Sequence, residues 1–393
     1  MRSGWLRRIW AAAAVLALAG GLWAQGAGAA EVKNVTAKYA WPWGVGISYE
    51  VSGTIPADVP LYVKAVDRTK NVTYYSVTNM LSGDTGTAAG KHQVVWDLDK
   101  QGISIQSTNV TFTVAYEWPL YCVVDLSAGA NASSYPVTYM YEPPSGGFNT
   151  DAYKTTKLVL RKIEAGTFTM GSPSSESGRN SNETQHKVTL TKPYYIGMFE
   201  VTQKQYALVM GSNPSSFLGD KRPVEKVSWN TIRGNTNWPA SSAVSASSFM
   251  GRIRARTGLG DFDLPTEAQW EYACRAGTTT AYSYGGSANG EYMWYSDNSS
   301  SQTHDVGSKK ANAWGLYDMH GNVWEWCLDC YASNLGTAAV TDPKGASSGS
   351  YRVKRGGSWS SGAAYCRSAY RSDYAPSGTS IYLGFRLSRI LSE

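Results

Sequence analysis

Residues 315–326 constrain this chain more than any other stretch, because they combine a tight turn with a pair of large aromatic side chains. They read Gly-Leu-Tyr-Asp-Met-His-Gly-Asn-Val-Trp-Glu-Trp. Gly321 and Asn322 stand where a backbone turns with positive φ and exposes its carbonyl groups. The two tryptophans that flank Glu325 predict a rigid loop packed into a core.

The oxygens of this loop predict a metal site. Ca²⁺ takes carboxylate, amide and backbone oxygens together, so a rigid loop that presents such oxygens suits it. We predict calcium ligands at Asp318, Gly321, Val323 and Glu325. The alternative is a buried tryptophan turn in which Glu325 pairs with an arginine.

Six further segments accompany this stretch in a fixed order along the chain. They are 163–171, 199–203, 223–229, 264–277, 355–359 and 383–387. Together with 315–326 they resemble the motifs of the sulfatase-modifying-factor family, the formylglycine-generating-enzyme-like domains. The resemblance covers residues 157–390. It implies an α+β, C-type-lectin-related fold, which hosts catalytic and non-catalytic members.

An alternation of apolar and polar residues ahead of that region predicts a separate domain. Runs such as 46–52, 61–66 and 110–115 alternate between turn segments, which is typical of a small antiparallel sandwich. We expect an all-β, immunoglobulin- or fibronectin-like sandwich at 30–117, a connector at 118–156 and the family domain at 157–393. A chain of 393 residues is long enough for two cores.

The first 29 residues predict a signal peptide. Three arginines precede an apolar run at 9–22, and the triplet 27–29 is a small-x-small cleavage site. The run is short for a membrane span, which needs about 20 apolar residues, and no other stretch is long enough. We therefore expect a secreted or periplasmic protein. Without those arginines the net charge of +6 falls to +3, which does not indicate nucleic-acid binding.

Five cysteines occur, at positions 122, 274, 327, 330 and 366. In an exported chain cysteines form disulfides by default, and an odd count leaves at least one of them unpaired. The resemblance implies a structural disulfide between Cys274 and Cys366. Cys327 and Cys330 form a lone CxxC, for which a local disulfide or two buried thiols is a better interpretation than zinc.

The same resemblance implies where an oxidase would bind copper(I). Active members use two thiols that fall four and nine residues after the second glycine of Arg-Gly-Gly-Ser, and here those positions hold Ser361 and Cys366. A serine hydroxyl is too hard a ligand to replace a thiolate on copper(I). A shifted alignment matches Cys366 to the structural disulfide instead. We treat Ser361 and Cys366 as a degenerate catalytic pair and expect calcium rather than copper as the cofactor.

The residues around that pair predict a binding cleft. Tyrosine and serine on a rigid scaffold supply contact area at low entropy cost together with adaptable hydrogen bonds. We predict ligand contacts at Trp359, Ser360, Tyr365, Tyr370, Asp373, Tyr374 and Tyr382. The segment also resembles the variable region of lectin-like proteins diversified by retroelements, which likewise ends in Gly-Phe-Arg. The alternative is that these tyrosines only cover the C-terminal strands.

These observations favour an exported binding or scaffold member of the family without oxidase activity. Its ligand would be a peptide, protein or glycan, and neither nucleic acid nor a membrane span is expected after signal cleavage. The alternative is a formylglycine-generating oxidase that converts a sulfatase cysteine or serine to formylglycine. The serine at position 361 is the residue that favours the first interpretation.

Overall fold

A computed structural model describes residues 31–391, apart from 41–43, 54, 56–58, 77–79, 106, 108 and 235–236. The predicted signal peptide lies outside the described residues. The chain divides into two compact units: one holds the N-terminal part up to Pro119 with Thr138–Tyr141, and the other holds Leu120–Val137 with the chain from Glu142 onward. Within the described residues no helix is long and apolar enough to cross a membrane.

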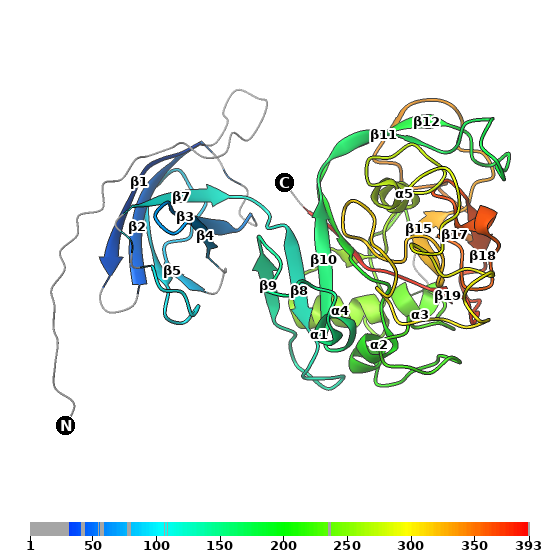
Figure 1. Ribbon diagram of the computed structural model, residues 1–393, viewed down its shortest axis with the longest axis horizontal. Coiled ribbons are helices and arrows are strands. Elements are labelled where there is room, and N and C mark those ends of the chain that lie inside the picture. The colour runs from blue at the N-terminus through cyan, green and yellow to red at the C-terminus, as the bar shows by residue number, and fades with distance from the viewer. Residues whose placement is uncertain are drawn as a thin grey trace. The chain divides into compact units, whose positions relative to one another are not determined.

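The first unit contains two antiparallel sheets, with the strand orders β1-β2-β6-β5 and β4-β3-β7 (Figure 1). The strands are β1 (Glu31–Ala40), β2 (Gly44–Ser52), β3 (Leu61–Asp67), β4 (Val72–Tyr75), β5 (Leu81–Gly83), β6 (Gly90–Asp97) and β7 (Val110–Tyr116). Successive side chains of a strand point to opposite faces, and every second residue of β3 is buried. Ile47, Val63 and Trp96 are fully buried in this unit. The sheet-rich N-terminal region expected from the alternation is therefore confirmed.

The largest sheet of the second unit has the order β14-β20-β13-β10-β8, and a smaller one has the order β11-β12-β16. The strands are β8 (Tyr121–Asp125), β10 (Lys157–Ile163), β11 (Gly166–Met170), β12 (His186–Leu190), β13 (Tyr194–Gly197), β14 (Phe262–Asp263), β16 (Val340–Thr341) and β20 (Ser388–Ile390). β8 pairs with β10 along its whole length, so the stretch expected as a connector contains a strand of this sheet. β9 (Val137–Met140) spans a boundary between the units.

The helices of the second unit are short. They are α1 (Asp151–Thr155), α2 (Gln203–Met210), α3 (Trp229–Arg233), α4 (Phe249–Thr257), α5 (Glu267–Arg275) and the 3₁₀ helix η2 (Ala363–Cys366). α5 starts with a capping box, in which the side chains of Thr266 and Gln269 each accept a hydrogen bond from the other's backbone amide. Thr202 and Gln205 form the same arrangement at α2. Helices and sheets together confirm the mixed α and β character of this unit.

A four-stranded sheet, β18-β17-β15-β19, positions the candidate site (Figure 1). Its strands are β15 (Trp324–Cys330), β17 (Arg352–Arg355), β18 (Ser372–Tyr374) and β19 (Leu383–Gly384). Glu325 is paired with Arg355 and Trp326 with Lys354, so each pair lies on its own face of the sheet. The Glu325 face packs on α5. The Lys354 face carries the aromatic residues of the candidate site.

Candidate functional site

The turn at Gly321 and Asn322 has the predicted backbone. Their φ angles are 100° and 58°, and a Cβ on Gly321 would lie 2.1 Å from the carbonyl oxygen of Trp294. Glycine is therefore required at that position. The Asn322 side chain donates to Glu200 Oε2 over 2.6 Å and accepts from the His304 amide over 3.0 Å. Polar contacts with two distant segments thus hold the turn.

The two carboxylates among the predicted calcium ligands have different partners. Both oxygens of Glu325 lie 2.6 Å from nitrogens of Arg386, and one of them also accepts from Trp270 Nε1 over 2.7 Å. This is the arginine-paired alternative. Asp318 accepts from the Gly307 amide through Oδ2, whereas its Oδ1 is buried without a hydrogen-bond partner. Burial raises the pKa of Asp318 to about 6. Calcium binding stays a prediction. Asp318 is the predicted carboxylate ligand with an oxygen that no hydrogen bond occupies.

Glu200 is a third buried carboxylate at this turn, and the sequence did not point to it. It accepts from the Val323 amide over 3.0 Å and from Asn322. Burial, and then the charges of Asp318 and Glu325, raise its pKa well above the usual range. In the part of the chain that the structure describes, no three histidine, cysteine, aspartate or glutamate side chains are grouped to hold a metal ion. A cation here would therefore depend on backbone oxygens as well.

The structure corrects the predicted disulfide between Cys274 and Cys366. All five cysteines lie in the described part of the chain, and all five are buried free thiols, the CxxC pair included. The His320 ring contacts both predicted partners: Nε2 lies 3.7 Å from the Cys274 sulfur, and Nδ1 donates to the Cys366 carbonyl over 2.7 Å. The Cys366 thiol packs instead in an apolar cluster with Tyr282 and Met293.

Ser361 and Cys366 present one hydroxyl and one buried thiol. Ser361 Oγ accepts from the Ser358 amide over 3.1 Å and lies 3.0 Å from Ser358 Oγ. The Cys366 thiol is fully buried, and burial raises its pKa to about 12. Gly357, with φ 74°, is needed here because a Cβ would lie 2.4 Å from the Cys366 sulfur. At neutral pH the predicted pair is a hydroxyl and a protonated thiol.

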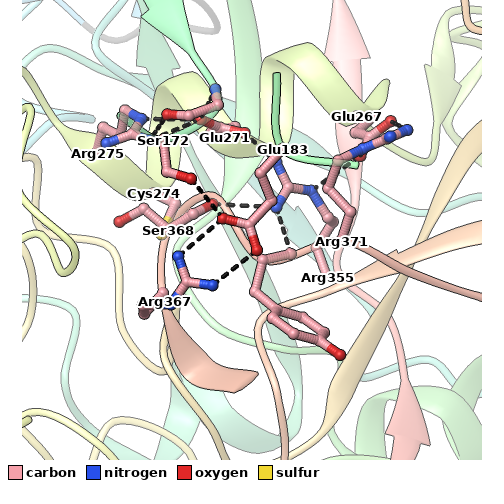
Figure 2. A network of polar contacts seen from close by, with 12 residues as sticks. Ser172, Glu183, Glu267, Glu271, Cys274, Arg275, Arg355, Arg367, Ser368 and Arg371 are labelled. Carbon is pink, nitrogen blue, oxygen red and sulfur yellow. Dashed lines mark hydrogen bonds and ion pairs between the residues drawn. The ribbon is translucent and has the colours of Figure 1, made fainter. Parts of the chain in front are cut away.

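A buried network of arginines and glutamates fixes the segment that follows Cys366, as Figure 2 shows. Arg367 binds Glu183 through two nitrogens at 2.8 and 2.7 Å, and Arg371 binds Glu267 at 2.5 and 2.8 Å. Burial alone would raise the pKa of Glu183, but the hydrogen bonds from Arg367 hold it below its usual value. Ion pairs on both sides therefore keep residues 366–371 in one conformation.

Two predicted tyrosines meet on the outside of this segment. Tyr365 is 47% exposed and packs edge-on against Tyr370, with ring centroids 4.9 Å apart. Tyr370 in turn lies 5.9 Å from the ring of Trp324 on β15. The residues Trp359, Tyr365, Tyr370, Tyr374 and Tyr382, together with the buried Trp324, are termed the aromatic surface.

Trp359 belongs to a more apolar part of the same surface. Its indole nitrogen donates to the Ile381 carbonyl over 3.1 Å, and its ring packs edge-on against Phe217 at 5.3 Å. Leu218, which follows Phe217, is 73% exposed. Ser360 is exposed, and its hydroxyl lies 3.1 Å from Ser358 Oγ. Trp359 therefore packs against the half-buried ring of Phe217, whose neighbour in the chain is an exposed leucine.

Lys354 contacts two further predicted ligand residues, Tyr374 and Tyr382. The sequence did not point to this lysine. Its amine lies 4.5, 5.5 and 5.7 Å from the ring centroids of Trp324, Tyr374 and Tyr382. The residue is only 8% exposed. Burial lowers its pKa to about 8, partly offset by the charge of Asp373. An amine bordered by three aromatic rings thus lies beside two of the predicted ligand residues, Tyr374 and Tyr382.

Comparisons with known proteins show which protein family the chain matches. The family model of the sulfatase-modifying factor enzyme 1-like domain matches residues 147–391. The chain is 30% identical over 311 residues to the chaperone protein LppX of Paenibacillus barcinonensis, covering 70% of this chain and 99% of that protein. It is 27% identical over 316 residues to the formylglycine-generating enzyme of Mus musculus, covering 67% and 84%. Among solved structures, Treponema denticola variable protein 1 is similar with a TM-score of 0.51 and 32% identity, over 60% of this chain and 95% of that one.

Proposed function

The chain belongs to the family of the sulfatase-modifying factor enzyme 1-like domain, and from this premise we propose that it is an exported member without oxidase activity. It binds a partner polypeptide on the aromatic surface. The observation that carries the proposal is the serine at position 361, where the resemblance requires a thiol.

The geometry around Ser361 supports the absence of copper chemistry. Copper(I) needs soft thiolate ligands. The Ser361 hydroxyl is held by Ser358, and the thiol of Cys366 is enclosed with a raised pKa of about 12. A site that offers one hydroxyl and one protonated, enclosed thiol does not fit copper(I).

The rigidity of the aromatic surface supports binding. Tyr365 and Tyr370 are attached to a segment whose arginines are paired with buried glutamates. Aromatic side chains on a fixed backbone lose little conformational entropy when a partner binds. The name of the LppX relative, a chaperone protein, supports a polypeptide as the partner.

The proposal also includes export, calcium binding and the two fold types that the sequence predicts. The predicted signal peptide supports export to a secreted or periplasmic location, and the unpartnered oxygen of Asp318 supports calcium as the cofactor. The two sheets of the first unit support an immunoglobulin- or fibronectin-like sandwich. The resemblance supports a C-type-lectin-related fold for the second unit.

A copper-dependent assay tests the loss of oxidase activity. The purified chain is incubated with copper(I), oxygen and a peptide of the form Cys-x-Pro-x-Arg, and the peptide mass is followed. We expect no aldehyde. Copper-dependent aldehyde formation by the wild-type protein would overturn this half of the proposal.

A random-peptide display selection tests the binding half. We expect enriched peptides whose affinity falls at least about tenfold in Tyr365→Ala. Tyr351→Ala is the matched control, since Tyr351 is 51% exposed but outside the aromatic surface. Enriched peptides that respond equally to both variants, or a selection without enrichment, would contradict binding at this surface.

A further inference from the structure

Lys354 differs from every other buried cation in the described part of the chain. The buried arginines all donate to carboxylate or carbonyl oxygens; they are Arg233, Arg275, Arg352, Arg355, Arg367, Arg371, Arg386 and Arg389. For Lys354, by contrast, the described residues provide neither an ion pair nor a hydrogen bond, only ring contacts and the more distant charge of Asp373. Its amine is therefore a buried cation that neither a counter-ion nor an oxygen acceptor contacts among the described residues.

The aromatic rings compensate only part of that charge. A cation over an aromatic face gains less from the ring than an ammonium loses when it is removed from water. Trp324 holds the amine closest, at 4.5 Å. The lowered pKa of Lys354, about 8, has the same cause, because burial disfavours its charged form. An anion beside the amine would supply the negative counter-charge that the rings do not provide.

Lys354 lies next to rings that belong to the aromatic surface. Lys354 lies on β17 opposite Trp326 of β15 and Ser372 of β18. Tyr374 and Tyr382, whose rings face the amine, are both only half-buried. The amine thus lies directly beneath residues that a bound polypeptide would contact.

We propose that Lys354 is the anchor of the aromatic surface, where its amine pairs with a carboxylate of the bound polypeptide while Tyr374 and Tyr382 shield the pair from water. This inference rests on the proposed binding function and names the chemical group that the surface selects. The carboxylate comes from an acidic side chain or from a chain terminus, and both present the same two oxygens to the amine.

Fluorine NMR with three small probes tests the inference on the full chain. The probes are N-acetyl-4-fluorophenylalanine, which carries a terminal carboxylate, its neutral amide, and N-acetyl-aspartyl-4-fluorophenylalanine amide, which carries a side-chain carboxylate. At pH 7 we expect at least one acid to bind about tenfold or more tightly than the neutral amide. The acid that binds identifies the source of the carboxylate.

Two variants separate the amine from the rest of the surface. Lys354→Met removes the charge and retains an apolar side chain of similar length, so the preference for the acid should disappear. Lys187→Met, at an exposed position of β12, should retain it. A measurement on the wild-type protein does not depend on either variant: the pKa of Lys354, followed through its side-chain nitrogen by NMR, should rise when the acid is added.

Four results would overturn the inference. They are equal binding of the acids and the neutral amide, a preference that survives Lys354→Met, a Lys354 pKa that does not respond to the acid, and the failure of all three probes to bind. If the acids and the amide bind equally and compete with a peptide from the display selection, the proposed binding function stands while the carboxylate anchor is lost. If no probe binds, the display selection alone decides the binding function.

Discussion

Glu325 and Arg386 form a two-point ion pair inside the second unit, with both N–O distances at 2.6 Å and both side chains fully buried. The pair joins β15 to the C-terminal segment. Trp270 Nε1 of α5 donates to the same carboxylate over 2.7 Å. The carboxylate between the two tryptophans of the motif is therefore a structural crosslink between three segments.

Removing this carboxylate should destabilise the fold strongly. Glu325→Gln leaves the guanidinium of Arg386 buried without its counter-charge, and breaking a buried pair in this way costs about 3–5 kcal/mol. Urea unfolding measures the change. Glu291→Gln is the control, because Glu291 pairs with Lys310 where both side chains are about 60% exposed, and an exposed pair contributes at most about 1 kcal/mol. Equal effects of the two substitutions would contradict the structural role of Glu325.

Chelation tests the predicted calcium site. A ligand present at 100 times its dissociation constant adds about 2.7 kcal/mol of stability, so removal of calcium should lower the melting temperature. Asp318→Asn should abolish most of this response, because Asp318 Oδ1 is the buried oxygen without a partner. The response should also weaken below pH 6, since the pKa of Asp318 is about 6 and its protonated form binds calcium poorly. If the chelator does not change the melting temperature of the wild-type protein, the predicted calcium site is excluded.

Features determined by neighbouring residues could be predicted from the sequence. The N-caps at Thr202 and Thr266 depend on residues three positions away, and the turn at Gly321 and Asn322 depends on its own backbone. Whether Cys274 and Cys366 form a disulfide could not be predicted in this way. That depends on how segments far apart in the chain pack, and in the structure both are free thiols that His320 contacts, through the sulfur of Cys274 and the carbonyl of Cys366.

The aromatic surroundings of Lys354 also depend on how strands that are far apart in the chain pair. Its ring partners come from β15, from β18 and from the residue before β19, and the register that brings them together is not visible in any one motif. One signal was present: Lys354 alternates with Arg352 along a strand, which places both on one face. The arginine-paired alternative for Glu325, in contrast, was available from the residue type alone.

Lys354→Met should stabilise the protein. At pH 7 the buried amine is charged, and a shift of its pKa from 10.5 to about 8 corresponds to a cost of at most about 3 kcal/mol. The unfolded chain holds the Lys354 proton up to higher pH than the folded chain, so wild-type stability should rise relative to the variant between pH 8 and 10. Asp373, Tyr374 and Tyr382 lie near the amine and are present in both proteins, so the comparison isolates Lys354. Urea unfolding at several pH values measures the difference, and a difference independent of pH would contradict the buried charge.

Ser361→Cys tests whether the position of one thiol accounts for the expected lack of copper binding. Cys366 is a free thiol in the structure, so the variant supplies two thiols at the spacing that the family resemblance requires, and its copper(I) affinity should rise at least about tenfold over the wild type. Copper binding must remove the proton of Cys366, whose pKa is about 12, so this affinity should increase steeply with pH. Competition with a coloured copper(I) chelator between pH 6 and 9 measures both effects. Ser360→Cys places a thiol at the exposed neighbouring position and should bind copper(I) only as a single exposed cysteine does. If the two variants bind equally, Cys366 does not take part in copper binding. The oxidase pattern would then be lost at both positions and not only at Ser361.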